Sequence, residues 1–171
     1  MRLMRWIAPV LAALATLPLL PGSALAARTY TAQVKGIEYS ATATVGKFAG
    51  TATGALPGTW RASVVHDPIT AAPKAPITGG SFQLYSHRPV TGRFVNGAVT
   101  RLNTPTACAN ERFDVRGNLA LDGGGTGQFT VVLTHRRTTV GARCVTYGAT
   151  VAGRLTLAPD HFGRRLISRP F

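Results

Sequence analysis

The sequence predicts an all-β domain that folds as an antiparallel up-and-down barrel of about eight to nine strands. Residues 127–136 alternate apolar and polar side chains with a period of two, which is typical of a half-buried strand. Similar segments recur along the chain, separated by short turn sequences such as Asp122-Gly123-Gly124-Gly125. After residue 26 no segment has the apolar stripe of an amphipathic helix. A two-sheet β-sandwich is the alternative, but closing the sheet removes its exposed edges and favours the barrel.

The chain begins with the features of a secretory signal peptide over residues 1–26. A start with two arginines precedes an apolar stretch at residues 6–20, and Ala24-Leu25-Ala26 is a small-x-small cleavage site. The apolar stretch is interrupted by proline and is shorter than the roughly 20 residues of a membrane-spanning helix. We therefore expect export and a secreted protein without a transmembrane segment, with one barrel domain over residues 27–157 and a basic tail over residues 158–171.

The first half of the predicted domain contains three strands and a loop. Residues 29–40 form the first strand, and a bulge is expected at Gly36 because the apolar side chains before and after it have opposite parity. Residues 46–54 form the second strand, whose glycines let a neighbouring chain approach closely. Residues 59–66 alternate cleanly and form the third. Residues 67–77 contain three prolines and are expected to form a surface loop across one end of the domain.

The second half is predicted to hold six further strands. Asn96-Gly97 predicts a tight hairpin, because both turn positions of such a hairpin need positive φ. A loop at residues 103–111 follows, and a glycine-rich turn leads into the strand at 127–136. The six strands are residues 80–87, 90–95, 98–102, 112–121, 127–136 and 143–157.

The only two cysteines, Cys108 and Cys144, are expected to form a disulfide, because secreted proteins mature in an oxidising compartment. Two free thiols are the alternative. The strands that follow these cysteines are predicted to lie on either side of a third strand, about 10 Å apart. A disulfide needs Cα atoms within about 7 Å. The loop at 103–111 must therefore fold over the end of the middle strand.

Three short motifs carry a resemblance to known proteins. They are Gly46-x-Phe48-x-Gly50-x-Ala52-x-Gly54, then Pro57-Gly58-x-Trp60, then Gly79-Gly80-x-Phe82. Their order resembles small exported β-proteins of unknown function from high-GC bacteria. More loosely, it is similar to the eight-stranded barrels of the allene oxide cyclase and dirigent type, over residues 30–157. That resemblance implies an apolar lumen and frequent oligomers, and it brings no catalytic motif to this chain.

The inward faces of the strands predict an apolar lumen. If their rings interlock completely, the barrel has no pocket for a ligand. The side chains expected to contact an apolar ligand in an open lumen are Trp60, Val64, Phe82, Phe94, Phe129 and Leu133.

One mouth of the predicted barrel gathers the candidates for acid–base chemistry. Glu38, His66 and Asp67 lie at strand ends that meet there, and a histidine beside carboxylates can be tuned for proton transfer. A surface histidine paired with its neighbour is the simpler interpretation. His135 also continues an apolar face, but the same strand numbering places it at the opposite mouth, away from His66. No metal site and no cofactor are expected, because no motif for either is present.

The chain is strongly basic, with 19 lysine and arginine residues against 6 aspartate and glutamate residues and a formal net charge of +13. Such an excess favours contact with anionic polymers or acidic surfaces. The arginines are scattered, so solubility is the simpler explanation, and nucleic acid is not an expected partner. The candidate anion-binding residues lie at a predicted turn and in the tail: Arg136, Arg137, Arg164, Arg165 and Arg169.

These features favour a secreted barrel that binds rather than catalyses. Its ligand is expected to be an apolar small molecule in the lumen or an anionic polymer of the cell envelope on the basic surface. An isomerase or cyclase using His66 and Glu38 is one alternative. A structural cell-surface protein that interacts through its exposed strand faces is the other.

Overall fold

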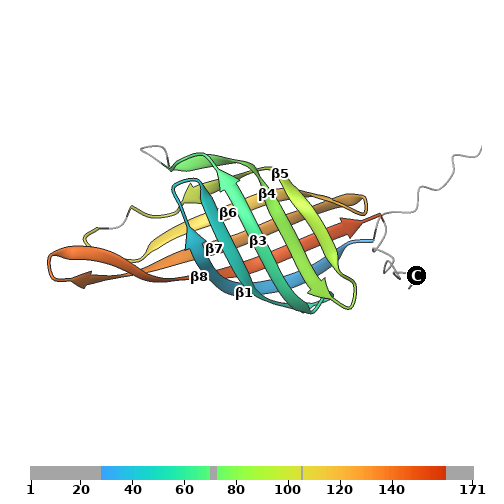
Figure 1. Ribbon diagram of the computed structural model, residues 1–171, viewed down its shortest axis with the longest axis horizontal. Coiled ribbons are helices and arrows are strands. Elements are labelled where there is room, and N and C mark those ends of the chain that lie inside the picture. Colours follow the sequence, from blue (N-terminus) through green and yellow to red (C-terminus); the bar gives the residue numbers. More distant parts are fainter. Residues whose placement is uncertain (1–27, 70–72, 105, 161–171) are drawn as a thin grey trace, which may run out of the picture.

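The computed structural model describes residues 28–69, 73–104 and 106–160, and these residues form eight strands and no helix. Each strand pairs antiparallel with the next, and β1 pairs with β8, so the sheet closes into an up-and-down barrel (Figure 1). The predicted barrel is confirmed, with eight strands. The strands are β1 (Tyr30–Ala41), β2 (Val45–Gly54), β3 (Gly58–His66), β4 (Lys74–Ser86), β5 (Val90–Arg101), β6 (Glu111–Leu121), β7 (Gly125–Val140) and β8 (Arg143–Pro159).

Three aromatic rings surround Phe129 in the middle of the barrel. The centroid of the Phe129 ring lies 5.5 Å from that of Trp60, 5.9 Å from Phe94 and 6.3 Å from Phe82. The ring planes are tilted or edge-to-face, the arrangements that aromatic quadrupoles favour. All four side chains are at most 3% exposed. The middle of this small barrel is therefore filled by side chains.

The predicted bulge at Gly36 is wrong. Pairing between β1 and β2 is regular through Gly36, and the register shifts only between Glu38 and Ser40. Ile37 and Tyr39 lie on the outer surface instead, 52% and 55% exposed. Gly36 faces Gly50, where a Cβ on either residue would collide with the backbone of the other strand. Because the alternation is unbroken, Glu38 points to the same side as the core residues of β1.

The predicted hairpin at Asn96-Gly97 is also wrong, because β5 runs unbroken through both residues. They pair with Asn118 and Gly117 of β6, and the irregularity is a bulge between Phe94 and Asn96. Gly97 has a φ of 147°, a conformation that suits a bulge as well as a turn. Removing one predicted strand reverses the direction of every later strand. The ends of β6, β7 and β8 therefore lie at the mouth opposite to the predicted one.

The loop predicted at residues 67–77 is shorter in the structure, because β4 begins at Lys74. Lys74, Ala75 and Pro76 belong to β4 and pair with the end of β5. Proline cannot donate a backbone hydrogen bond, but the carbonyl oxygen of Pro76 accepts one from the N–H of Asp67 at 3.1 Å. Residues 70–72 of this segment lie outside the described part of the chain.

The hairpin of β7 and β8 extends past the rest of the wall. β1 pairs with β8 only as far as Ile37 and Thr150, and β6 pairs with β7 only as far as Glu111 and His135. Beyond these points β7 and β8 continue as a two-stranded ribbon, residues 136–148, which projects at the left of Figure 1 in orange. We call these residues the ribbon.

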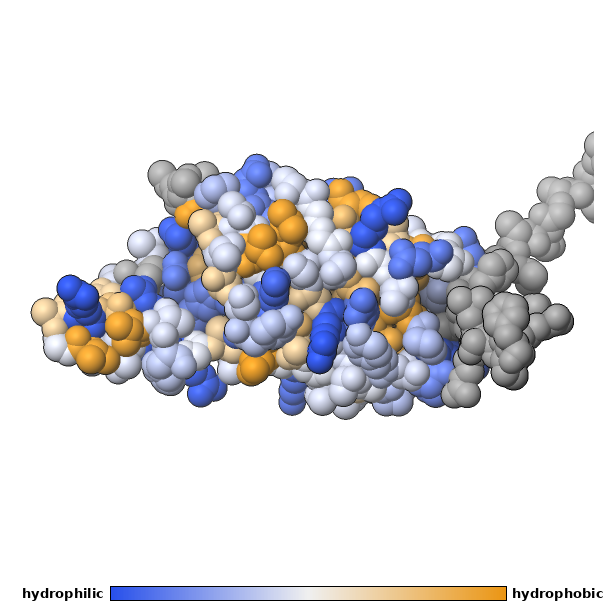
Figure 2. Space-filling model, in the orientation of Figure 1, coloured by the Kyte–Doolittle hydropathy of each residue, from blue (hydrophilic) through white to orange (hydrophobic). Residues whose placement is uncertain are grey.

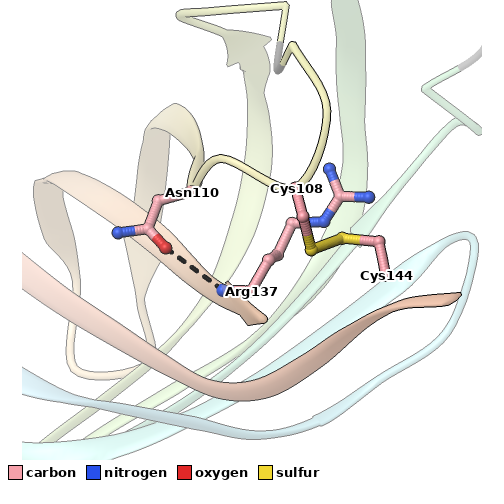
Figure 3. Close-up of a disulfide and its surroundings, with 4 residues drawn as sticks. All are labelled: Cys108, Asn110, Arg137 and Cys144. Carbon is pink, nitrogen blue, oxygen red and sulfur yellow. Dashed lines mark hydrogen bonds between the residues drawn. A yellow bond between two sulfur atoms is a disulfide. The ribbon is translucent and has the colours of Figure 1, made fainter. Parts of the chain in front are cut away.

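The predicted disulfide between Cys108 and Cys144 is confirmed, with Cα atoms 5.5 Å apart. Cys108 lies in the β5–β6 connection and Cys144 on the ribbon (Figure 3). The connection passes over β7, because Oδ1 of Asn110 accepts a hydrogen bond of 3.1 Å from the backbone N–H of Arg137. This is the crossing that the strand spacing predicted.

Among the described residues no helix is long and apolar enough to cross a membrane. β8 continues to Pro159, two residues beyond the predicted end of the domain. The predicted signal peptide lies outside the described residues, as does the tail from residue 161 onward.

Candidate ligand-binding pocket

A pocket of about 430 Å³ occupies one end of the barrel. We call this the open end; it is where β1, β3, β5 and β7 finish and where the ribbon projects. The volume lies in the range of about 300–1,000 Å³ typical of small-molecule sites. The pocket is lined by Glu38, Ala41, Thr42, Ala43, Val45, Gly46, Phe48, Val64, His66, Pro68, Ile69, Val99, Arg101, Glu111, Phe113, Val115, Leu133 and His135.

The inner part of the pocket is apolar. Six of its lining residues belong to the buried core and come from β2, β3, β5, β6 and β7. They are Phe48, Val64, Val99, Phe113, Val115 and Leu133.

The predicted ligand-lining residues divide into two groups. Val64 and Leu133 line the pocket. Trp60, Phe82 and Phe94 instead pack around Phe129 in the filled middle. The alternation of side chains along a strand identifies which residues face inward, but it does not give their depth along the barrel.

Glu38 and His135 form the most buried polar contact of the pocket. Oε2 of Glu38 lies 2.7 Å from Nε2 of His135, and the two side chains are 7% and 21% exposed. The His135 ring also packs edge-on against Phe113, with centroids 5.3 Å apart. The prediction that His135 lies at the opposite mouth from His66 is wrong, because it rested on the hairpin that β5 does not contain.

His66 lines the same pocket as Glu38, but the structure records no contact between them. Nδ1 of His66 lies 2.7 Å from the carbonyl oxygen of Asp67. A carbonyl oxygen can only accept, so Nδ1 carries the hydrogen and donates it. The side chain of Asp67 is not among the lining groups, and Asp67 contributes through its backbone.

Arg101 and Glu111 form an ion pair on the pocket wall, with Nε of Arg101 3.1 Å from Oε1 of Glu111. This is a charge contact without hydrogen-bond alignment, since Nε is buried and has no aligned acceptor in the described part of the chain. The guanidinium also lies 6.0 Å from the centroid of the Phe113 ring. Sequence reasoning missed this pair. The only indication in the sequence was that Arg101 and Glu111 flank the loop that carries Cys108.

These groups give the pocket two chemical capacities. Its apolar inner surface can bury a hydrocarbon or ring, and its polar groups can orient one end of it. The contact of a carboxylate with an imidazole is also an arrangement that can move a proton. Among the described residues no cluster of histidine, cysteine or carboxylate groups is suited to hold a metal ion.

The ribbon carries the described part of the predicted anion-binding set. Arg136 is exposed, while Arg137 is half-buried with its side chain beside the disulfide (Figure 3). Arg143, which is not one of the predicted residues, is also exposed on the ribbon. Val140 and Tyr147 are 60% and 64% exposed on the same ribbon. Apolar and strongly polar residues lie side by side at this tip of the molecule in Figure 2. Arg164, Arg165 and Arg169 lie outside the described residues.

Comparison of the chain with protein-family models, with curated proteins and with solved structures finds no match. The resemblance to exported β-proteins and to cyclase-type barrels therefore stays a prediction. What the pocket and the ribbon can do has to be argued from their own geometry.

Proposed function

We propose that this protein is a secreted binding protein whose open-end pocket takes a small, largely apolar molecule. The observation that carries the proposal is the pocket itself, about 430 Å³ with an inner surface of buried apolar side chains. Its inner surface combines buried apolar side chains with a few polar groups, as small-molecule sites do. A barrel that fills its middle with four aromatic rings yet leaves this space at one end has the form of a ligand site.

The polar groups of the pocket support binding of a largely apolar molecule with a small polar head group. Arg101 and Glu111 offset each other's charge, and Glu38 lies against the imidazole of His135. These two contacts can remain in place when an apolar group enters the pocket. The cost of desolvation then falls on the ligand alone. Burial of apolar surface then favours binding by about 25 cal/mol for each Å² removed from water.

Secretion is part of the proposal and has two supports. Residues 1–26 have the composition of a signal peptide, and the disulfide is consistent with an oxidising compartment. Edman sequencing or mass spectrometry of the protein recovered from culture medium tests it. A mature chain beginning at Ala27 is expected, whereas retention of Met1 in the cell fraction would contradict secretion.

The pocket is tested with the uncharged fluorophore N-phenyl-naphthylamine, whose emission rises in an apolar environment. We expect saturable fluorescence enhancement with the native protein. Val45 lines the pocket, so Val45→Trp should fill it and weaken probe binding about tenfold or more. Val95→Trp is the matched control, because Val95 is 47% exposed on the outer surface. Equal binding by both variants would place the probe elsewhere.

A second candidate function is favoured by the ribbon, which we propose binds an anionic polymer of the cell envelope. Its residues 136–148 include three arginines and no carboxylate. Two of these, Arg136 and Arg143, are exposed on a segment that stands clear of the barrel. A cationic projection can follow a polyanion without steric conflict from the rest of the surface.

Retention on immobilised polyphosphate tests the ribbon. The double variant Arg136→Ser with Arg143→Ser should elute at lower salt than the native protein. The matched control is Arg61→Ser with Arg93→Ser, which removes the same charge from exposed positions on β3 and β5. If both double variants lose retention equally, net charge rather than the ribbon is responsible.

A further inference from the structure

The next inference rests on the proposed function and concerns the head group of the ligand. Glu38 is the key residue, because its side chain is only 7% exposed and lines the pocket. Its Oε2 atom contacts His135. Its Oε1 atom lies against Gly46, so close that a Cβ on Gly46 would be 2.7 Å away. Within residues 28–69, 73–104 and 106–160 no hydrogen bond reaches Oε1, and this oxygen is accessible from the pocket.

Oε1 is not one of the buried atoms without a partner, so it is reached from the pocket and is open to water or to a ligand. Each carboxylate offers about four acceptor positions, and a ligand donor can replace a water that occupies one of them. Gly46 beside Oε1 has no side chain, and the Phe48 ring, which also lies against Gly46, has no donor. A donor on the ligand would therefore complete the hydrogen bonding of Glu38, and a bond to a charged acceptor is among the stronger ones.

The other charged groups of the wall argue against an anionic ligand. Arg101 faces the pocket but is paired with Glu111, and His135 is engaged by Glu38. His66 uses its Nδ1 hydrogen on the carbonyl of Asp67. A carboxylate entering this pocket would meet two carboxylates, whereas the one arginine that lines it already lies against Glu111 and its Nε is buried.

We propose that the pocket selects an apolar molecule with a hydrogen-bond-donating head group, best of all a protonated amine, which Glu38 accepts, and that it rejects carboxylates. The apolar body would lie against Leu133 and Val115, and the head group would lie on the pocket side of Oε1 of Glu38. Glu38 thereby determines specificity, and the apolar inner surface supplies general affinity.

Four compounds with one aromatic skeleton test the proposal by displacement of N-phenyl-naphthylamine from the unmodified protein. They are naphthylmethylamine, naphthylmethanol, ethylnaphthalene and naphthoate. The amine should displace the probe at a concentration about tenfold below that needed for ethylnaphthalene. Naphthylmethanol should lie between them, and naphthoate should be weakest. Displacement by naphthoate as strong as by the amine would overturn the proposal without any mutation.

Three carboxylate variants locate the selectivity. Glu38→Gln keeps the size of the side chain and should abolish the preference for the amine over ethylnaphthalene. Glu111→Gln removes the other carboxylate of the pocket, and Asp114→Asn removes one paired with Arg116 on the outside of the barrel. Both should keep the preference. If the preference survives Glu38→Gln in a folded protein, or is lost in Glu111→Gln instead, the assignment to Glu38 is wrong.

The outcomes separate this inference from the function on which it rests. If N-phenyl-naphthylamine does not bind, the pocket is not a ligand site and both proposals fail. If ethylnaphthalene displaces the probe as well as the amine does, the binding function stands and only the donor preference is wrong.

Discussion

The two ends of the barrel are formed by the same eight strands but are finished differently. At the closed end each connection between strands has three residues, and Leu56 of the β2–β3 turn is 1% exposed within the core. At the open end the β3–β4 and β5–β6 connections are longer, and β7 and β8 run on as the ribbon. The closed end buries the apolar side chain of Leu56, whereas the open end leaves a pocket with two carboxylates, one beside His135 and one beside Arg101.

This difference indicates that stability and ligand binding depend on different parts of the barrel. The filled middle and the closed end contain the tightly packed apolar side chains, so they hold most of the stability. The open end contains partly exposed polar groups and longer connections, which cost stability but are where binding residues usually lie. Substitutions at the two ends should therefore affect different measurements.

The largest effect is expected in the middle, at Phe129. Phe129→Ala removes a ring that touches Trp60, Phe82 and Phe94 and should cost about 3–5 kcal/mol of unfolding free energy. Urea denaturation followed by tryptophan fluorescence measures it. Tyr85→Ala is the control, because Tyr85 is 50% exposed on the outer surface, and it should change stability by less than about 1 kcal/mol. Similar losses in both variants would contradict a filled middle.

The two ends are compared directly by Leu56→Ala and Ile69→Ala. Leu56 is fully buried at the closed end, so its truncation should cost about 2–5 kcal/mol. Ile69 is half-buried beside the pocket, where truncation enlarges an existing space instead of creating a void. Its cost should be under about 1.5 kcal/mol. Thermal unfolding of both variants measures the difference, and a reversed order would show that the open end carries the stability.

Removing the disulfide should cost an intermediate amount. Cys108→Ser with Cys144→Ser frees a crosslink of sequence separation 36, expected to stabilise by about 2–4 kcal/mol. Hydrogen exchange should become faster in residues 106–111 and in the ribbon, because the disulfide joins them. Exchange at the closed end, in residues 54–58, should not change. Faster exchange at both ends would mean that the crosslink stabilises the whole barrel uniformly.

A smaller stability effect than that of losing the disulfide, together with a clear binding effect, is expected for Gly46→Ala. The new Cβ would lie 2.7 Å from Oε1 of Glu38 and 2.8 Å from Cζ of Phe48. The Phe48 ring is buried in the core and must shift to make room, so the cost should be about 1–3 kcal/mol. The shift of the Glu38 carboxylate should nevertheless weaken binding of naphthylmethylamine. Gly148→Ala is the control, since no atom lies within 4 Å of a Cβ there, and it should leave both measurements unchanged.

Most of the fold could be predicted because it is encoded by local alternation. The strand at 127–136 and the need for a loop to cross it before Cys108 could reach Cys144 both follow from strand geometry. The error at Asn96-Gly97 arose because a glycine-containing bulge and a hairpin turn favour the same backbone conformations. Only the pairing of both flanking segments with β6 distinguishes them.

The candidate site was less predictable, because it depends on strand direction and register. Glu38 and His66 line one pocket, as the positions of their strand ends predicted. The partner of Glu38, however, is His135. The prediction placed His135 at the other end because it counted one strand too many before it. Arg101 and Glu111 meet through the register of β5 against β6, which no local pattern reveals. The depth of Val64 and Leu133 in the lumen likewise depends on the shear of the whole barrel.

The seam between β1 and β8 has a consequence for how the chain is made. Tyr30 of β1 pairs with Leu157 of β8, so the barrel can close only after the last strand has been synthesised. Loop closure over such a separation is slow, and until then both outer strands carry unpaired N–H and C=O groups. A newly made chain therefore passes through an open sheet that is prone to self-association, and a holding chaperone would be of most use to it at that stage.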